Sequence, residues 1–386
     1  MAAEQGFPQE LLDQPAAARI EYFKQYTMAH PLLKEANEKL RSAILEPAGS
    51  NLVFLFGPTG VGKTTLQQRI RKMLTTEMLP ELEADPGRIP FVSIEAVGPD
   101  SGSWSWKDFY KRILIELKEP LVKYKRRPDA RLAPTGDETL LHPRAPGTEL
   151  RYALEQALRY RKTTAVMIDE AQHLAKMASG RKYQDQMDSI KSLANMTGTV
   201  HVLLGTYELL AFRNLSGQLS RRSTDIHLRR YRADSDEDRG MFMSILLTFQ
   251  RYMPLKEEPE LTQHWEYLYE GSVGCVGILK DWLLRALVAA LKAGRETLTF
   301  KTLQNTAFST SQCEKIASEV IEGETIIEEK VGARTRLQNL LGLSVPASNT
   351  TQVPIPIPSS EPRTPKLKPG VRKPRRDPIG GHENNA

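Results

Sequence analysis

The sequence predicts an α/β fold in which helices flank a parallel sheet, followed by a helical domain and a disordered tail. Short apolar runs that end in glycine or in acidic residues indicate buried parallel strands. Helical patterns alternate with these runs, as they do in parallel α/β sheets. From about Asp234 the strand signals stop and helical periodicity dominates. At 386 residues the chain is too long for one small core, so we expect two packed units with extensions.

The elements follow from the N-terminus onward. Residues 14–46 predict helix with an apolar stripe, broken at Pro31. A buried strand, NLVFLFG, comes next and leads into the helix TTLQQRIRKML. The further strand predictions are FVSIEAV (91–97), TAVMID (164–169), VHVLLGT (200–206) and a run after the arginine pair at 221–222, and SWKDFYKRILIEL (105–117) predicts a helix.

Composition changes suggest where these regions begin and end. We predict an N-terminal helical extension (1–50), an α/β core (51–233), a helical lid domain (234–330) and a Pro-rich basic tail (331–386). Residues 123–147, rich in Pro, Arg and Gly, predict an inserted loop. Nine prolines and scattered charges from Leu341 onward predict disorder.

Charge and composition narrow the classes of function. The formal net charge is +6, and the segment from Leu341 carries seven Lys or Arg against three acids, so it supplies most of the excess. This balance favours a polyanionic partner. Two cysteines are too few for a disulfide framework, and we expect a reducing, cytoplasmic setting. We expect neither a membrane span nor an export signal, because the sequence contains no sufficiently long apolar run and the N-terminus has no basic region before an apolar one.

A phosphate-binding loop is the strongest motif. GPTGVGKT (57–64) fits G-x4-G-K-[ST] and lies between a predicted buried strand and a helix. Its glycines let backbone N–H groups turn toward phosphate oxygens, and the helix N-terminus adds positive charge. Lys63 would reach the β- and γ-phosphates of ATP, and the Thr64 hydroxyl would bind Mg²⁺. The alternative is a glycine-rich turn that matches by chance. The expected nucleotide contacts are Gly57, Pro58, Thr59, Gly60, Val61, Gly62, Lys63, Thr64 and Thr65.

An acidic pair ends the strand AVMIDE. Asp169 is suited to hold Mg²⁺ and Glu170 to orient the attacking water. Two adjacent carboxylates at the end of a buried strand are costly unless a cation or a ligand uses them. A plain strand-end turn is the alternative.

Other residues are candidates for sensing nucleotide. The Thr206 hydroxyl could hydrogen-bond to the γ-phosphate or to the attacking water, although threonine is also common in strands. Arg221 and Arg222 could reach the γ-phosphate of a neighbouring subunit, or could lie on a solvated basic turn. Lys280, near a helix start in the lid, could report on the γ-phosphate or be an exposed lysine.

Basic patches are candidates for DNA contact, because Lys and Arg neutralise phosphates. Each patch taken alone is more often a solvated surface, because a run of charges needs no partner. No helix-turn-helix or zinc-finger pattern appears, so we expect binding to double-stranded DNA that is mostly independent of sequence. The candidates are Trp104, Lys107, Lys111, Arg112, Lys123, Arg126, Arg181 and Lys182.

Taken together, GPTGVGKT, VMIDEAQH, LLGTYEL and QLSRRS resemble the TniB/TnsC family, AAA+ ATPases that regulate Tn7-like transposons, over residues 14–328. The resemblance implies an ATP-dependent switch that forms rings or filaments on double-stranded DNA. It further implies a bacterial, nucleoid-associated protein that connects a TniQ-type target selector to transposase subunits. Lys280 departs from simple AAA+ patterns, which have a sensor arginine there.

Two other functions remain open. A signalling or scaffold ATPase that acts only through protein partners would hydrolyse ATP regardless of DNA. A replication-type loader is expected to carry a winged-helix domain after the lid, for which the predicted tail leaves no room.

Overall fold

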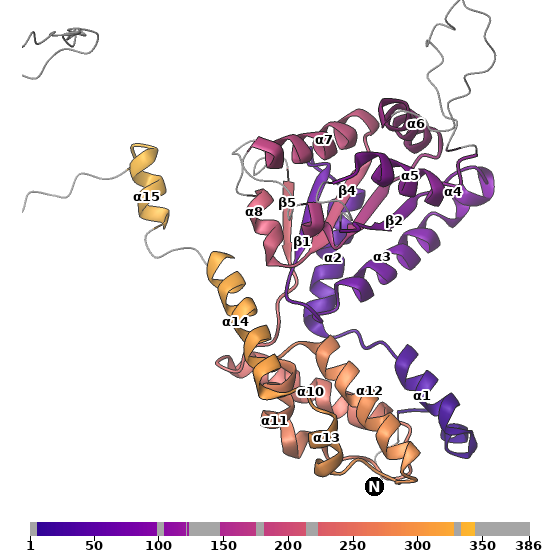
Figure 1. Cartoon of the computed structure of the whole chain (residues 1–386), viewed down its shortest axis with the longest axis vertical. Coiled ribbons are helices and arrows are strands. Elements are labelled where there is room, and N and C mark those ends of the chain that lie inside the picture. Colours follow the sequence, from indigo (N-terminus) through magenta and orange to yellow (C-terminus); the bar gives the residue numbers. More distant parts are fainter. Residues whose placement is uncertain are drawn as a thin grey trace, which may run out of the picture. The chain divides into compact units, whose positions relative to one another are not determined.

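The computed structural model describes residues 6–98, 104–120, 122, 147–174, 181–213, 223–327 and 333–343 (Figure 1). The side chains of residues 181–184, 212, 213 and 333 are outside this description. The chain divides into two units, Met1–Glu328 and Glu329–Ala386. In the second unit the described part contains helix α15 (Ala333–Leu340). Most of the predicted inserted loop and the tail beyond residue 343 lie outside the described residues.

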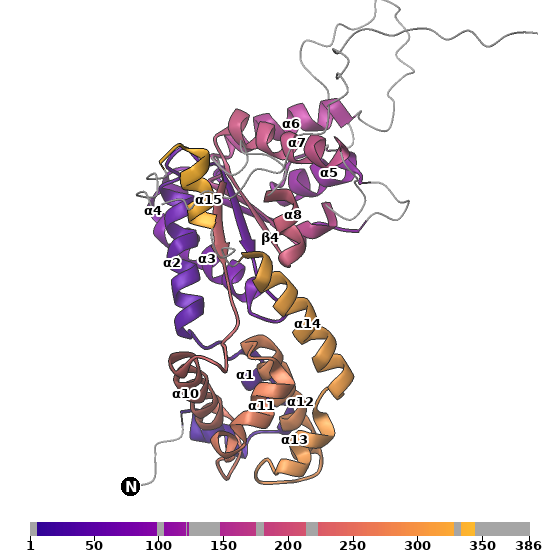
Figure 2. The same cartoon turned by 90° about the vertical axis from the view of Figure 1, so that its left-hand side faces the viewer.

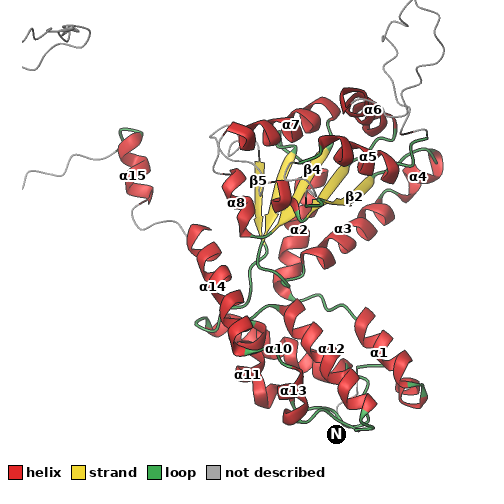
Figure 3. Ribbon diagram, viewed as in Figure 1, coloured by secondary structure: helices red, strands yellow, loops and turns green. Residues whose placement is uncertain are grey.

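A parallel sheet is the centre of the first unit and confirms the predicted α/β fold (Figure 3). Its strand order is β2-β3-β4-β1-β5, and every neighbouring pair is parallel. β1 lies between β4 and the edge strand β5, so the phosphate loop that follows it lies at the carboxyl edge of the sheet beside the end of β4. The strands are β1 (Leu52–Phe56), β2 (Phe91–Glu95), β3 (Ala165–Asp169), β4 (Val200–Gly205) and β5 (Ser223–His227).

Both faces of the sheet are buried, which explains why the strands are continuous apolar runs. Along β1, Phe54 and Phe56 pack into one core, while Val53 and Leu55 pack into the other. The first core also takes side chains from α5 (Trp106–Glu116), α6 (Gly147–Tyr160) and α7 (Arg181–Thr197), and the second from α2 (Pro31–Leu45) and α3 (Lys63–Glu77). Two short helices, α4 (Leu79–Ala84) and α8 (Leu210–Arg213), complete this region.

The N-terminal helical pattern forms two helices, α1 (Ala16–Gln25) and α2. Pro31 is the first residue of α2, where its missing N–H costs nothing and its fixed φ suits a helix start. The predicted break at Pro31 is therefore where the second helix begins.

The C-terminal region of the first unit is helical, as predicted, with Trp282 in a fully buried core. The Trp282 indole nitrogen donates to the Leu303 carbonyl at 3.0 Å, which satisfies its polar atom. Phe23 of α1 packs into this core as well. No helix in the described ranges is both long and apolar enough to cross a membrane. The helices are α10 (Asp236–Tyr252), α11 (Trp265–Ser272), α12 (Val276–Lys292), α13 (Phe300–Thr306) and α14 (Thr310–Ile327).

Helix α14 extends from the helical region to the carboxyl edge of the sheet (Figure 2). Val320 packs into the sheet core, and the Cys313 thiol contacts the Gly271 carbonyl of α11 at 3.7 Å. Arg230 lies in the segment that leads from β5 to α10. It donates two hydrogen bonds, each 3.1 Å long, to the Glu324 carboxylate of α14. Arg230 also donates to the Tyr269 hydroxyl at 2.9 Å, so one partly buried arginine connects α11 and α14.

Candidate nucleotide-binding site

The phosphate loop joins β1 to α3 in the predicted strand-to-helix position. Gly60 and Gly62 have φ of 71° and 111°, in the left-handed region that other residues rarely adopt. Helix α3 begins at Lys63, so its free N–H groups point into the loop. The backbone thus has the strand–turn–helix geometry that an anion-binding loop needs, and the nucleotide contacts stay a prediction.

Lys63 is buried across this loop. Its ammonium donates to the carbonyls of Gly57 at 3.0 Å and Pro58 at 2.9 Å. Burial lowers the Lys63 pKa, while the nearby carboxylates of Glu170 and Asp169 oppose that effect. A phosphate in the loop would add to the counter-charge that these two acids supply to the buried cation.

The predicted magnesium residues lie together, Thr64 in the first turn of α3 and Asp169 at the end of β3. The Thr64 hydroxyl is 3.4 Å from Asp169 Oδ2, although the two residues are 105 positions apart in sequence. Burial raises the Asp169 pKa, and the hydrogen bond from the Glu170 N–H opposes this shift. An alcohol oxygen beside a carboxylate matches the hard oxygen ligands that Mg²⁺ prefers.

Glu170 follows Asp169 in a left-handed conformation, with φ of 51°. Such a conformation costs energy for a residue other than glycine and persists only where the surroundings enforce it. The Glu170 carbonyl accepts the His173 N–H at 2.9 Å, and its carboxylate accepts the Gln172 amide at 2.5 Å. Gln172 was not among the predicted site residues, although it lies within the quoted VMIDEAQH segment.

Thr206 lies at the end of β4, next to the phosphate loop. Its hydroxyl oxygen is buried and has no hydrogen-bond partner among the described residues. Thr206 also lines a cavity of about 540 Å³ that Pro58 and Thr59 share with one face of α14. An unpaired buried hydroxyl in such a place fits the predicted contact with phosphate or water.

The lid contacts the phosphate loop directly through α12. The Ile278 N–H donates to the Gly60 carbonyl at 3.3 Å, and a side chain at Gly277 would collide with that same carbonyl oxygen. Lys280, predicted to contact nucleotide, donates to the Lys24 carbonyl at the end of α1, at 2.8 Å. In this conformation Lys280 therefore joins α12 to α1, and its role toward nucleotide stays a prediction.

The predicted arginine-finger and DNA-contact residues are described only in part. Arg221, Arg222, Lys123 and Arg126 lie outside the described residues, as do the side chains of Arg181 and Lys182. Arg112 on α5 pairs with Asp108 at 2.6 Å. Lys107 and Lys111 lie on the same helix, half-buried.

Trp104 precedes α5 and is part of an aromatic cluster rather than standing alone. Its ring packs edge-on against Trp106, with centroids 6.1 Å apart, and against Phe109. The Trp104 indole nitrogen is buried without a hydrogen-bond partner among the described side chains. Its predicted contact with DNA stays a prediction.

The grouped residues fit a nucleoside triphosphate with magnesium. A left-handed glycine loop, a buried lysine and a helix N-terminus would hold phosphates, and Thr64 and Asp169 would hold the metal. Magnesium, when bound, would neutralise charge on the phosphate oxygens. This fit rests on the paired oxygens, the buried cation and the unpaired Thr206 hydroxyl.

Comparison with known proteins agrees with this fold. Residues 48–212 match the family described as "AAA domain". No curated protein matches the sequence. Among solved structures, the chain is similar to the Aeropyrum pernix ORC2 protein in its ADPNP–ADP complexes, with 16% identity over 76% of this chain and 71% of that chain and a TM-score of 0.51. It is also similar to the Aeropyrum pernix ORC1 protein in complex with DNA, with 14% identity over 74% and 68% of the two chains and a TM-score of 0.50. At these identities the similarity shows the fold alone. The match over residues 48–212 and these two similarities agree with an AAA+ P-loop fold.

Proposed function

We propose that this chain is an ATP-hydrolysing regulator of DNA transposition, of the kind that the TniB/TnsC resemblance implies. The observation that carries the ATPase part is the grouping of Lys63, Thr64, Asp169, Glu170 and Thr206 at the carboxyl edge of the sheet. The transposition part rests on the sequence resemblance. Three of its segments, GPTGVGKT, VMIDEAQH and LLGTYEL, lie at or beside this site, and nearly all of QLSRRS lies outside the described residues.

The roles of the residues follow from their chemistry. Lys63 and the loop N–H groups bind the phosphates, while Thr64 and Asp169 hold magnesium. The Glu170 carboxylate orients the attacking water and accepts its proton as the water oxygen bonds to the γ-phosphorus and the bond to ADP breaks. The Thr206 hydroxyl, buried and unpaired within the described structure, donates to the phosphate or the water.

The assembly is the second part of the proposal. Arg221 or Arg222 of one subunit would reach the phosphate held by its neighbour, so ATP would stabilise a ring or filament on double-stranded DNA. Hydrolysis would release that assembly, and the protein would connect a target selector of TniQ type to the transposase. Slow turnover suits this role, because the bound state must last while partners assemble.

Glu170→Gln tests the chemistry and the switch together. The amide cannot accept the proton, so hydrolysis should fall by about 10²-fold or more while ATP binding is retained. The variant should then remain on DNA with ATP, as measured by co-sedimentation. Glu35→Gln removes an equally charged carboxylate from an exposed ion pair on α2 and serves as the control. Wild-type hydrolysis in Glu170→Gln would contradict the assigned role.

A second candidate is an origin-binding or loader ATPase, which the similarity to the two ORC structures favours. The two proposals differ in how DNA is chosen. A regulator of transposition should assemble equally on unrelated duplexes, whereas an origin-binding protein should prefer one sequence under competition. ATP hydrolysis that ignores DNA altogether would instead favour the scaffold that acts only through protein partners.

A further inference from the structure

Gln172 connects two parts of the site that the chain separates. It lies in the 3-10 turn Ala171–Leu174 after β3 and is 4% exposed. Its amide nitrogen donates to Glu170 Oε2 at 2.5 Å, and its amide oxygen accepts the Thr206 N–H at 3.3 Å. One side chain thus bridges the predicted catalytic carboxylate and the end of β4.

The surroundings are built to admit this bridge. A methyl group at Gly205 would lie 2.3 Å from the Gln172 amide oxygen, so a glycine is needed where the amide meets β4. On the other side, the left-handed backbone of Glu170 turns its carboxylate toward Gln172. The small size of Gly205 and the left-handed conformation of Glu170 therefore both leave room for the Gln172 amide.

We propose that Gln172 is a positioning residue for hydrolysis: its amide holds the Glu170 carboxylate in a fixed position relative to Thr206 at the end of β4. This inference rests on the proposed ATPase activity and adds a residue to it. An amide suits the task because it donates to the carboxylate with one end and accepts the backbone N–H with the other. A glutamate would present an oxygen to Glu170, and the two negative charges would repel each other.

The position of a general base controls rate more strongly than it controls binding. A displacement of about 1 Å at a reacting group can cost roughly 10²-fold in rate, while phosphate contacts elsewhere are unchanged. Gln172 contacts neither Lys63 nor Thr64 through any hydrogen bond within the described structure. Its loss should therefore lower kcat and leave nucleotide affinity in place.

Two substitutions at this position test the inference. Gln172→Leu removes both hydrogen bonds and keeps a side chain of similar volume. Gln172→Glu keeps an acceptor for the Thr206 N–H but replaces the hydrogen bond to Glu170 with repulsion between two carboxylates. Both should lower kcat roughly 10- to 100-fold, with KM for ATP and affinity for ADP within about threefold of wild type. In a Glu170→Gln background, Gln172→Leu should add little further loss, because the group that it positions is already disabled.

Gln250 is a matched control within the same chain. On α10 its amide donates to Glu258 at 2.7 Å and accepts the Thr262 N–H at 3.4 Å, the same pattern away from the phosphate loop. Gln250→Leu should therefore leave kcat unchanged. Thermal unfolding of all variants measures any structural loss separately.

Several outcomes would overturn the role of Gln172. They are a kcat for Gln172→Leu within twofold of wild type, a parallel loss of ADP binding, or a full further loss in the Glu170→Gln background. Wild-type protein that binds ATP without hydrolysing it would overturn both this inference and the ATPase proposal. Normal Gln172-dependent hydrolysis without assembly on DNA would refute the transposition role alone.

Discussion

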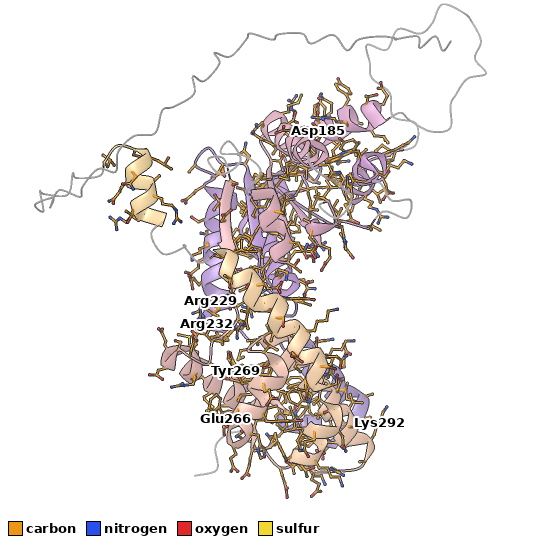
Figure 4. The ribbon with its side chains drawn as sticks, turned by 60° about the vertical axis from the view of Figure 1, so that its left-hand side comes forward. Asp185, Arg229, Arg232, Glu266, Tyr269 and Lys292 are labelled. Carbon is orange, nitrogen blue, oxygen red and sulfur yellow. The ribbon has the colours of Figure 1, made fainter. Side chains whose placement is uncertain are left out.

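Asp238 on α10 is the best place to test the connection between the sheet and the helical region. Its side chain is 3% exposed and accepts two hydrogen bonds from Arg229, one of 2.9 Å to Oδ1. It also accepts the Arg232 backbone N–H at 2.8 Å. Figure 4 shows Arg229 and Arg232 near Tyr269, where the segment after β5 enters the helices. We predict that Asp238→Ala destabilises this junction.

The magnitude follows from these contacts. Breaking a buried ion pair typically costs about 3–5 kcal/mol, since the remaining partner is left without its counter-charge. Arg229 is 38% exposed at its side chain, so water can solvate part of its charge after the substitution. We therefore expect the lower end of that range, about 3 kcal/mol.

Asp236 supplies the control, because it lies in the same first turn of α10 and also pairs with an arginine. Its side chain is 89% exposed, in a pair with Arg239. Asp236→Ala should cost less than about 1 kcal/mol, including any interaction with the helix dipole.

Urea unfolding followed by tryptophan fluorescence measures the difference, since Trp282 is buried in the helical core. A loss of 3 kcal/mol should lower the urea midpoint by about 1–3 M at the usual dependence on denaturant. If Asp238→Ala and Asp236→Ala unfold at the same midpoint, the junction does not depend on the buried pair.

Two further predictions concern the lid contact and pH. Gly277→Ala should weaken ATP binding, because the added methyl would lie 2.3 Å from the Gly60 carbonyl oxygen; Gly240→Ala on α10 meets nothing within 4 Å and should be neutral or slightly stabilising. Equal ATP affinity in both variants, measured by titration calorimetry, would contradict that contact. Burial lowers the pKa of His201 to about 4, so the unfolded chain binds more protons than the folded one between pH 4 and 6.5. Stability should therefore fall on acidification, by about 2 kcal/mol from this group at pH 5. His201→Gln should reduce the change in urea midpoint between pH 7 and 5 without removing it, because burial also lowers the pKa of His30 and His227 to about 4. An unchanged slope would show that His201 is not the source.

The strands and the phosphate loop could be predicted because their signals are local. The apolar run at Leu52–Phe56 and the motif that follows it need no information from elsewhere in the chain. The pairing of Thr64 with Asp169 was also predictable, because the carboxyl ends of parallel strands meet at one edge of a sheet.

The contacts between distant elements could not be predicted in the same way. The bridge from Gln172 to Thr206 depends on β3 and β4 being neighbours, which no local pattern specifies. Likewise, Lys280 looked free to reach a phosphate, but its ammonium is held by the carbonyl of Lys24, 256 positions earlier. A polar residue beside the predicted catalytic pair, the glutamine of DEAQ, is the signal that would have suggested Gln172.

Analytical ultracentrifugation of the full chain with double-stranded DNA tests the central claim most directly, in ATP, a slowly hydrolysed analogue, ADP and no nucleotide. The account predicts large assemblies on DNA with ATP or the analogue, and not with ADP or without nucleotide. A protein that stays monomeric and off DNA in all four conditions would contradict the proposed function.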